Sequence, residues 1–496
     1  MRARGNLFAA LRRTAFALAF MLPVVAAGAA FAGEQPKVYT LDQLIAVAIE
    51  RSPELQAAGQ QVDSALYDLA QANAGKWAQF DATVVAAPVP DADRPTVTVS
   101  ATPNADGTLR GVIDENSGQE SLGPFGRLDF TLSQPVFTFG KISYRQEAAR
   151  HGVAAKQAAL DQKRGELIEK VKTMYYGMLV AQQGESAAND VNSFVEDTRK
   201  KINTLMELKA QNVDPNDIHR LETYAAGVES FKAKASSGAR MARMALQRTV
   251  GLPPGEDFKL DRSELPKDAE TLPSSQEFID KALHSRPELE QLKEGLEARR
   301  NLVEAAKADL YPSIFLALIG SFAYAPGRDS FDNDYITDDY NHSTFGAFVG
   351  AKWHFDFGIE QARVKKARAE YLELKHTKQY AEQNIPLEVM KCYEDAVEAQ
   401  GSYQAYAKGA KEGRRWLVSA FSNFDLGVGP ARDIFEALDQ YGKNQGEYLR
   451  ALYGYHVAMA KLSRAAGEYR KAGPPRSSEE PFPKSVDSET PAREIP

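Results

Sequence analysis

The sequence contains 496 residues, carries a formal net charge of −7 and includes a single cysteine, Cys392. The negative charge argues against a nucleic-acid partner, because proteins bind a phosphate backbone mainly through Lys and Arg. One cysteine excludes a disulfide within the chain and a metal cluster held by several cysteines.

The N-terminus predicts a secretory signal peptide over residues 1–32. Four arginines (Arg2, Arg4, Arg12 and Arg13) precede an apolar segment from Ala15 to Ala27, and the motif Ala30-Phe31-Ala32 stands before Gly33. A basic start, an apolar stretch and a small-residue cleavage motif together define such a signal. Cleavage would change the net charge to −7 − 4 = −11. The alternative is an uncleaved membrane anchor.

The remaining sequence is an internal duplication. Residues 44–80 align without gaps to residues 278–314, so that Pro53-Glu54-Leu55 matches Pro287-Glu288-Leu289. A duplicated unit of roughly 200 residues is much longer than the repeats of solenoid proteins. Each copy reads as helix, strand, loop, strand, very long helix, short break and helix.

This pattern divides the chain into two structural repeats, expected at 33–270 and 271–471. The tail at 472–496 is rich in Pro, Ser and Glu, a composition that predicts disorder.

Four membrane strands are expected, near 80–88, 126–138, 312–325 and 344–357. In the second of them, Leu128, Phe130 and Leu132 alternate with polar residues. No segment after the signal supplies about 18 apolar residues for a membrane helix, so a closed β-barrel remains as a way to span a bilayer. Alternation would then separate a lipid face from a wet lumen, which places Phe130 and Val349 toward lipid and Asp129 and Lys352 toward the lumen. The alternative is a soluble antiparallel sheet with one wet face. Four strands cannot enclose a useful lumen, so several chains would have to share one barrel.

Two very long helices are predicted at Lys141–Val213 and Ile359–Leu426, the second with Pro386 as an expected kink. A helix of 73 residues, the length of the first segment, would reach about 110 Å. Helices of this length need partner helices, so we expect them to pack as in a coiled coil. The alternative is an ordinary helical bundle or rod, which has the same spacing of apolar residues. The breaks near 211–217 and 426–433 predict the tips of two helical hairpins.

No catalytic, cofactor-binding or metal-binding motif is present, so an enzyme is not predicted. The sequence lacks the H-E-x-x-H zinc motif, the G-x-S-x-G elbow and the phosphate-binding P-loop. The segment 328–343 contains Asp329, Asp332, Asp334, Asp338 and Asp339. Calcium binding there stays open, but the spacing lacks the glycine and terminal glutamate of an EF-hand, which favours a solvated acidic loop.

In order along the chain, several motifs resemble the outer membrane factors of the TolC family. They are Ser52-Pro53-Glu54-Leu55 with its copy Arg286-Pro287-Glu288-Leu289, Gln134-Pro135-Val136-Phe137 before Gly140, Trp353-His354-Phe355-Asp356 before Gly358, and Gly427 followed by Asp433 and Leu438. The resemblance covers about residues 40–470.

The resemblance implies a mainly α fold with a membrane β-barrel. Three chains would give four strands each to a twelve-stranded barrel, continued by a periplasmic α-helical barrel. Such a homotrimer would lie in the outer membrane of a Gram-negative bacterium, in contact with lipid. It would act as the passive exit duct of a tripartite efflux pump or type I secretion system, with a periplasmic adaptor and an inner-membrane transporter as partners.

The resemblance also implies site residues at the hairpin tips. A periplasmic gate would include Asp217, Asp433 and Glu436, and Leu426-Gly427-Val428 would contact the adaptor. The competing interpretation of the carboxylates is that they complement the positive ends of helix dipoles.

Some tip residues depart from the family pattern. Gln211 stands where a glycine is expected, and Phe424 and Gly429 replace a tyrosine and a basic residue that form a latch in relatives; Arg432 could substitute. The cargo cannot be named from the sequence. The alternative function is a periplasmic coiled-coil structural or adaptor protein.

Overall fold

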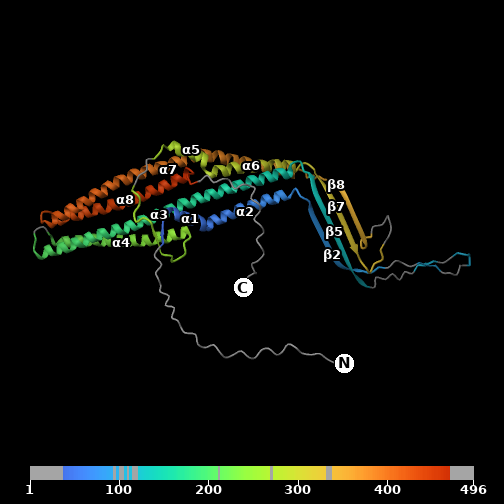
Figure 1. The fold of residues 1–496 in the computed structure, drawn as a ribbon, viewed down its shortest axis with the longest axis horizontal. Coiled ribbons are helices and arrows are strands. Elements are labelled where there is room, and N and C mark those ends of the chain that lie inside the picture. Colours follow the sequence, from blue (N-terminus) through green and yellow to red (C-terminus); the bar gives the residue numbers. More distant parts are fainter. Residues whose placement is uncertain are drawn as a thin grey trace, which may run out of the picture.

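The computed structural model describes residues 37–92, 97–99, 105–108, 111–113, 121–210, 213–267, 272–330 and 338–469. The expected signal peptide at 1–32 and tail at 472–496 lie outside these ranges. The helices form a long rod, and a four-stranded sheet bends away from one end of it (Figure 1). Within the described ranges, no helix combines the length and apolar character needed to cross a membrane.

The helices are α1 (Leu41–Arg51), α2 (Pro53–Ala74), α3 (Lys141–Glu207), α4 (Pro215–Val250), α5 (Ser275–Ser285), α6 (Pro287–Ala308), α7 (Ile359–Asp425) and α8 (Ala431–Ala465). The strands are β1 (Lys37–Tyr39), β2 (Gln79–Pro90), β3 (Val97–Val99), β4 (Gly111–Ile113), β5 (Leu122–Phe137), β6 (Phe258–Leu260), β7 (Ser313–Tyr324) and β8 (His342–Lys352).

The duplication is visible in the helix lengths. The short helices α1 and α5 each have 11 residues, α2 and α6 each have 22, and α3 and α7 each have 67. Each long helix begins directly after a left-handed glycine, Gly140 (φ 85°) or Gly358 (φ 117°), a conformation that residues with a Cβ atom avoid. The two copies therefore turn from strand into helix in the same way.

The start of the second helix in each copy differs locally. Pro53 and Pro287 both occupy the first turn, where a missing N–H costs nothing. Ser52 caps α2 by accepting a hydrogen bond from the Leu55 amide, whereas Arg286 makes no such cap. The Arg286 side chain instead forms ion pairs with Glu288 and Glu388.

The main sheet has the order β2-β5-β7-β8, with every neighbouring pair antiparallel. Both β2 and β8 are edges in the single chain. The last strand ends at Lys352, paired with Ser313, and not near 357 as expected, because β7 begins at Ser313 and offers no partner for the aromatic segment Trp353–Phe357. The first long helix likewise ends at Glu207 and not at Val213.

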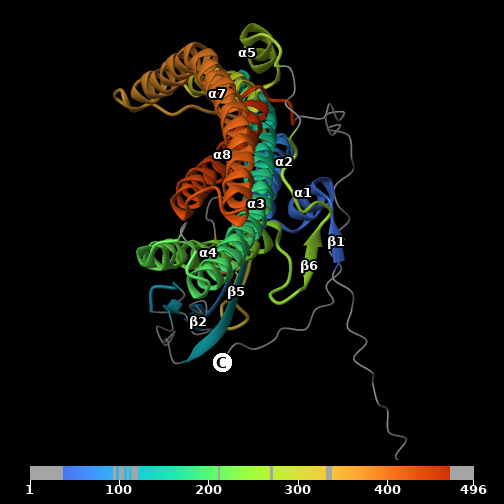
Figure 2. The ribbon, with the colours of Figure 1, turned by 90° about the vertical axis from the view of Figure 1, so that its left-hand side faces the viewer.

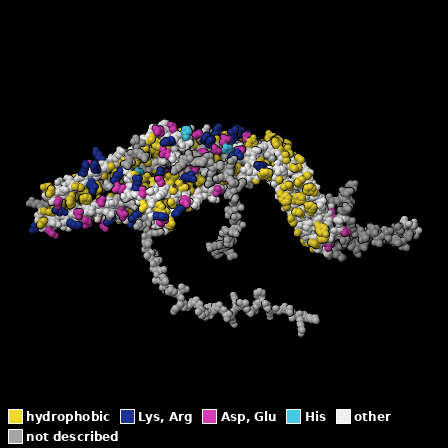
Figure 3. Space-filling view, in the orientation of Figure 1, with side chains coloured by type: hydrophobic (Ala, Val, Ile, Leu, Met, Phe, Trp, Pro, Cys, Tyr) yellow, Lys and Arg dark blue, Asp and Glu magenta, His cyan; other side chains and the backbone are white. Residues whose placement is uncertain are grey.

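The sheet has one strongly apolar face. Phe130 lies opposite Gly320, which lies opposite Phe345, and the Phe130 ring fills the space above Gly320. By the same register, Asp129 shares the other face with Ser321. Val349 lies four residues from Phe345 on the apolar face, and Lys352 lies on the opposite face. Figure 3 shows hydrophobic side chains gathered over the sheet, while charged side chains cover the helical rod.

Two antiparallel hairpins, α3–α4 and α7–α8, form the rod and lie side by side (Figures 1 and 2). Near their tips a common apolar core contains residues of all four helices, including Ile202, Leu221, Leu417 and Ile434. The small parallel sheet β1–β6 lies on the flank of the rod (Figure 2).

The segment that joins the two repeats forms hydrogen bonds with both long helices in the middle of the rod. Tyr175 of α3 donates a hydrogen bond to Asp261 (2.7 Å), and Tyr403 of α7 donates one to the Lys267 carbonyl (3.2 Å). The connection between α4 and α5 therefore holds both hairpins together.

Candidate functional site

The first tip, between α3 and α4, is built around a helix cap. Asp214 is the N-cap of α4 and accepts a hydrogen bond from the Asn216 amide, and its own amide donates to Asp217 Oδ2 (2.9 Å). Asp217 is only 5% exposed, and its other oxygen lies 3.4 Å from Arg220 Nη1. This reciprocal capping box uses the Asp217 carboxylate within its own helix.

The second tip, between α7 and α8, presents apolar side chains to solvent. Gly427 takes the left-handed conformation (φ 77°), and the amides of Gly427 and Val428 donate to carbonyls of the last turn of α7. This is the usual way to end a helix at a glycine. It leaves Leu426 76% exposed and Val428 77% exposed, although both are apolar.

The two carboxylates of the second tip differ from Asp217 in that both are exposed. Asp433 and Glu436 lie on the side of α8 away from the buried Ile434 and Phe435. Because they are three residues apart, they share one helix face. Glu436 accepts a hydrogen bond from Arg432 Nε at 2.8 Å, a pairing along the same helix.

Ion pairs that the sequence analysis missed tie the hairpins near the tips. Lys201 of α3 pairs with Asp425 at the end of α7, and Arg199 pairs with Glu222 of α4 at 2.9 Å. The first of these pairs joins the two repeats. No local spacing links Lys201 to Asp425, so only the arrangement of the two hairpins in the folded chain brings them together.

An apolar groove of about 380 Å³ runs between the hairpins, behind the tips. It is lined by α3, α4 and α8, with Tyr224, Val228 and Phe231 on one side and Leu438 and Leu449 on the other. Three further lining residues are Gly227, Gly442 and Gly446, and there is open space where each of them would carry a Cβ atom. The spacing of Gly442 and Gly446, one helical turn apart, is the sequence signal that could have indicated this groove.

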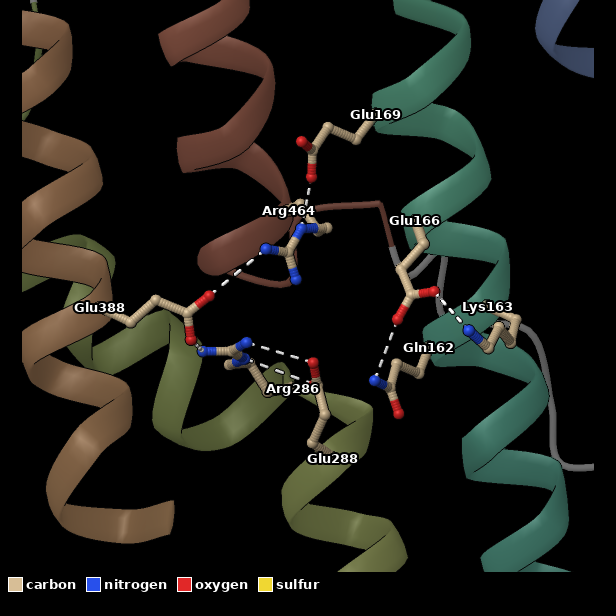
Figure 4. Close-up of polar contacts among 8 residues, drawn as sticks. All are labelled: Gln162, Lys163, Glu166, Glu169, Arg286, Glu288, Glu388 and Arg464. Atoms are coloured by element: carbon tan, nitrogen blue, oxygen red, sulfur yellow. Dashed lines mark hydrogen bonds and ion pairs between the residues drawn. The ribbon is translucent and has the colours of Figure 1, made fainter. Parts of the chain in front are cut away.

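Figure 4 shows a cluster of ion pairs around Arg286 and Arg464. The Arg286 side chain is 5% exposed and lies between Glu288 (3.1 Å) and Glu388 (2.6 Å). Arg464 of α8 contacts Glu388 and also Glu169 of α3. Burial alone would raise the pKa of Glu388, but the two arginines outweigh burial and hold that pKa below its usual value. The cluster joins four helices and the α5–α6 junction.

Metal binding finds no support in the described part of the chain. No group of three His, Cys, Asp or Glu residues lies close enough there to hold an ion. Within the acidic segment, Asp338 Oδ1 accepts hydrogen bonds from the amides of Tyr340 and Asn341. Asp332 and Asp334 lie outside the described residues.

The chain matches the family model described as outer membrane efflux protein over residues 44–193 and 278–468. These two ranges fall in the two copies of the duplication. A comparison with curated proteins returned no match.

Solved structures with the same fold include outer-membrane channels. VceC of Vibrio cholerae is 17% identical, with a TM-score of 0.67, over 86% of this chain and 96% of that chain. The open state of MtrE of Neisseria gonorrhoeae is 19% identical, with a TM-score of 0.66, over 86% and 88%. CusC is 16% identical, with a TM-score of 0.68, over 91% and 99%. At these identities the likeness establishes the fold.

Proposed function

The chain belongs to the outer membrane efflux protein family, and we propose that it is the exit duct of a tripartite efflux pump or type I secretion system. As a member of this family it is an outer membrane protein with a long periplasmic helical part. The observation that carries the proposal is an antiparallel sheet, apolar on one face, at the end of two hairpins whose long helices have 67 residues each.

The sheet favours a barrel shared by three chains. Among the described residues, the edge strands β2 and β8 each pair on one side only, and exposed edges of this length invite pairing with another strand. Pairing β8 of one chain with β2 of the next would remove every edge and give twelve strands. Phe130, Phe345 and Val349 would then face lipid, and Asp129 and Lys352 would face the lumen.

A helical partner fits the tip and the groove behind it. Leu426 and Val428 on either side of Gly427 form an exposed apolar knob, and the groove beside α8 is apolar with glycines at its open side. An amphipathic helix docks into such grooves through apolar residues spaced one turn apart. We propose that the hairpin of a periplasmic adaptor binds here and couples the duct to an inner-membrane transporter.

The gate proposal rests mainly on Asp433. In a trimer Asp433 and Glu436 would form two rings of three carboxylates around the narrow end of the duct, and such rings favour cations. Glu436 is partly neutralised by Arg432. For Asp217 we propose a supporting role, because its carboxylate closes the cap that shapes the first tip.

Fractionation followed by bilayer recording tests this function. We expect the protein in the outer-membrane pellet, running as a trimer on unboiled electrophoresis, and forming channels in planar bilayers. A monomer in the soluble periplasmic fraction would favour the alternative of a coiled-coil structural or adaptor protein. In the proposed duct the chain performs no chemistry, and the transporter supplies the energy.

A further inference from the structure

Aromatic side chains close the junction between the two repeats, where the sheet meets the helical rod (Figure 1). Phe139, just after β5, stacks on Tyr311, just before β7, with ring centroids 5.2 Å apart and ring planes at 17°. Phe137 packs edge-on against Phe139 at 4.7 Å, and its backbone pairs with Ile314 of β7. This contact joins the end of a strand in the first repeat to the start of a strand in the second.

The strand end of the second repeat carries the same aromatic pair without a partner for it. Phe355 and Phe357 stand before the glycine that precedes α7, as Phe137 and Phe139 stand before the glycine that precedes α3. Phe355 is 75% exposed and Phe357 is fully exposed. Phe139 also takes a left-handed backbone conformation (φ 51°), uncommon for a bulky residue, which Phe357 does not take. The packed and the unpacked phenylalanine therefore differ although their local sequences match.

The strand start of the first repeat carries the missing half of the contact. In the ungapped alignment of the two copies, Trp77 occupies the position of Tyr311, and Phe80 occupies that of Ile314. Trp77 is 66% exposed and Phe80 is 64% exposed. Large aromatic side chains gain most from being covered, so two exposed pairs at matching positions indicate an unmade contact.

The two exposed pairs lie at opposite edges of the sheet, because β5 and β7 separate β2 from β8. A second copy of the chain can bring them together. Neighbouring strands in this sheet are antiparallel, so pairing β8 with β2 of the next chain sets the end of β8 beside the start of β2. Resting on the proposed trimeric duct, we propose that Phe357 of one chain stacks on Trp77 of the next, with Phe355 against Phe80. Each junction between chains would then repeat the aromatic contact of the junction between repeats.

The charged contacts of the internal junction have no counterpart between chains. Asp309 at the end of α6 lies 3.3 Å from Lys141 and 3.0 Å from Arg145 of α3. The duplication places Gly75 at the position of Asp309 and Ile359 at that of Lys141. The contact between chains therefore depends on apolar and aromatic packing. The competing occupant of these rings is the lipid interface, where aromatic girdles of membrane barrels lie.

Cysteine crosslinking in isolated outer membranes tests which occupant is present. Trp77→Cys and Phe357→Cys are combined in a chain whose native cysteine is removed by Cys392→Ser, and a short, reducible thiol crosslinker is added. After boiling we expect covalent dimers and trimers that reductant returns to monomers. Phe357→Cys combined with Tyr324→Cys is the matched control, because Tyr324 is equally exposed but lies at the far end of β7. The control pair should stay monomeric after boiling.

The coupling between the two aromatic residues provides a second readout. Trp77→Ala and Phe357→Ala should each lower the temperature at which the trimer dissociates on unboiled electrophoresis. The double variant should dissociate no earlier than the weaker single variant, because either change removes the whole contact. Trp77→Ala combined with Tyr324→Ala should instead show additive shifts.

The outcomes separate this contact from the duct itself. A wild-type trimer that gives no covalent oligomers, or additive shifts for Trp77→Ala and Phe357→Ala, would assign these rings to lipid and overturn the contact while leaving the duct intact. A wild-type protein that is monomeric before any crosslinking would overturn both.

Discussion

The ring of Tyr469, just after α8, occupies the space that a Cβ atom on Gly165 of α3 would need. A Cβ atom built at Gly165 would lie 2.2 Å from Tyr469 Cζ. Burial raises the pKa of the Tyr469 hydroxyl, so the ring stays neutral in this position. The chain reaches this site by turning at Gly467 (φ 73°), which lies against Ser285. The end of the second repeat is thus anchored on the long helix of the first.

We therefore predict that Gly165→Ala destabilises the protein although alanine favours helix. Overpacking typically costs about 1–3 kcal/mol, more than the 0.5–1 kcal/mol that alanine gains over glycine in a helix. Thermal unfolding followed by circular dichroism measures the change. Gly184→Ala is the matched control, because no atom lies within 4 Å of its Cβ position, and it should be neutral or stabilising. Tyr469→Ala should make Gly165→Ala harmless; a destabilisation that persists in the double variant would exclude the proposed contact.

The buried Arg286 provides the second prediction. Arg286→Ala leaves Glu288 and Glu388 without their shared partner and should cost about 2–4 kcal/mol, at the low end of values for buried pairs because Glu388 is partly exposed. Arg300, paired with Glu297 on the surface, is the control, and Arg300→Ala should cost less than about 1 kcal/mol. Urea or thermal unfolding distinguishes them. If Arg286→Ala and Arg300→Ala lowered the free energy of unfolding equally, burial of the Arg286 ion pairs would add no stability beyond that of a surface pair.

Acid should weaken the same cluster. The pKa of Glu388 is lower in the folded than in the unfolded chain, so its ionised form stabilises the fold above its usual value of 4.5. This contribution is lost as the pH falls through the lowered folded-state pKa. Unfolding measured between pH 3 and pH 7 should show a smaller acid-induced loss for Glu388→Gln than for the wild type. An unchanged pH profile would contradict this assignment.

The fourth prediction concerns the lipid face. Val349→Arg should cost about 2–4 kcal/mol if the position lies near the bilayer midplane. Gly346→Arg is the control on the opposite face, since only Ile319 lies within 4 Å of its Cβ position. Gly350 is unsuitable as a control because the Phe315 ring fills its space. Unfolding in liposomes gives the comparison, and a more damaging Gly346→Arg would mean that the two faces are exchanged.

Local patterns were sufficient to predict the long helices and the four strands of the main sheet, but not the short strands β1, β3, β4 and β6 or the contacts between elements. Alternation around Phe130 predicts which residues share a face, because a strand repeats every two residues. It does not predict where a strand ends, since Lys352 is the last paired residue only because β7 begins at Ser313. The matching Pro53 and Pro287 predict helix starts. They give no sign that Arg286, the counterpart of Ser52, pairs with a glutamate 102 residues away.

At the two hairpin tips, too, the sequence predicted candidate site residues but not the contacts that they make. The family resemblance groups Asp217 with Asp433 and Glu436, but the backbone of the first tip uses Asp217 as the third residue of a capping box. A cap of this kind can be anticipated from Asp214 followed by Pro215, with Asp217 at the third helical position. The pairing of Lys201 with Asp425 depends on how the hairpins α3–α4 and α7–α8 are arranged, and no local pattern contains that information.

The last prediction separates the three tip carboxylates by function. Asp433→Ala should reduce the cation preference of the channel and its block by trivalent cations, because it removes an exposed ring of charge. Glu436→Ala should have a smaller effect, because Arg432 already neutralises part of its charge. Asp217→Ala should leave selectivity unchanged and cost about 1 kcal/mol of stability through the lost cap. Single-channel recording in planar bilayers measures selectivity, and thermal unfolding measures the cap. Suppose instead that the Asp433→Ala, Glu436→Ala double variant retains the wild-type cation selectivity and the block by trivalent cations. These two carboxylates would then only stabilise the first turn of α8, and the ring of charge at the entrance would have to be formed by other residues.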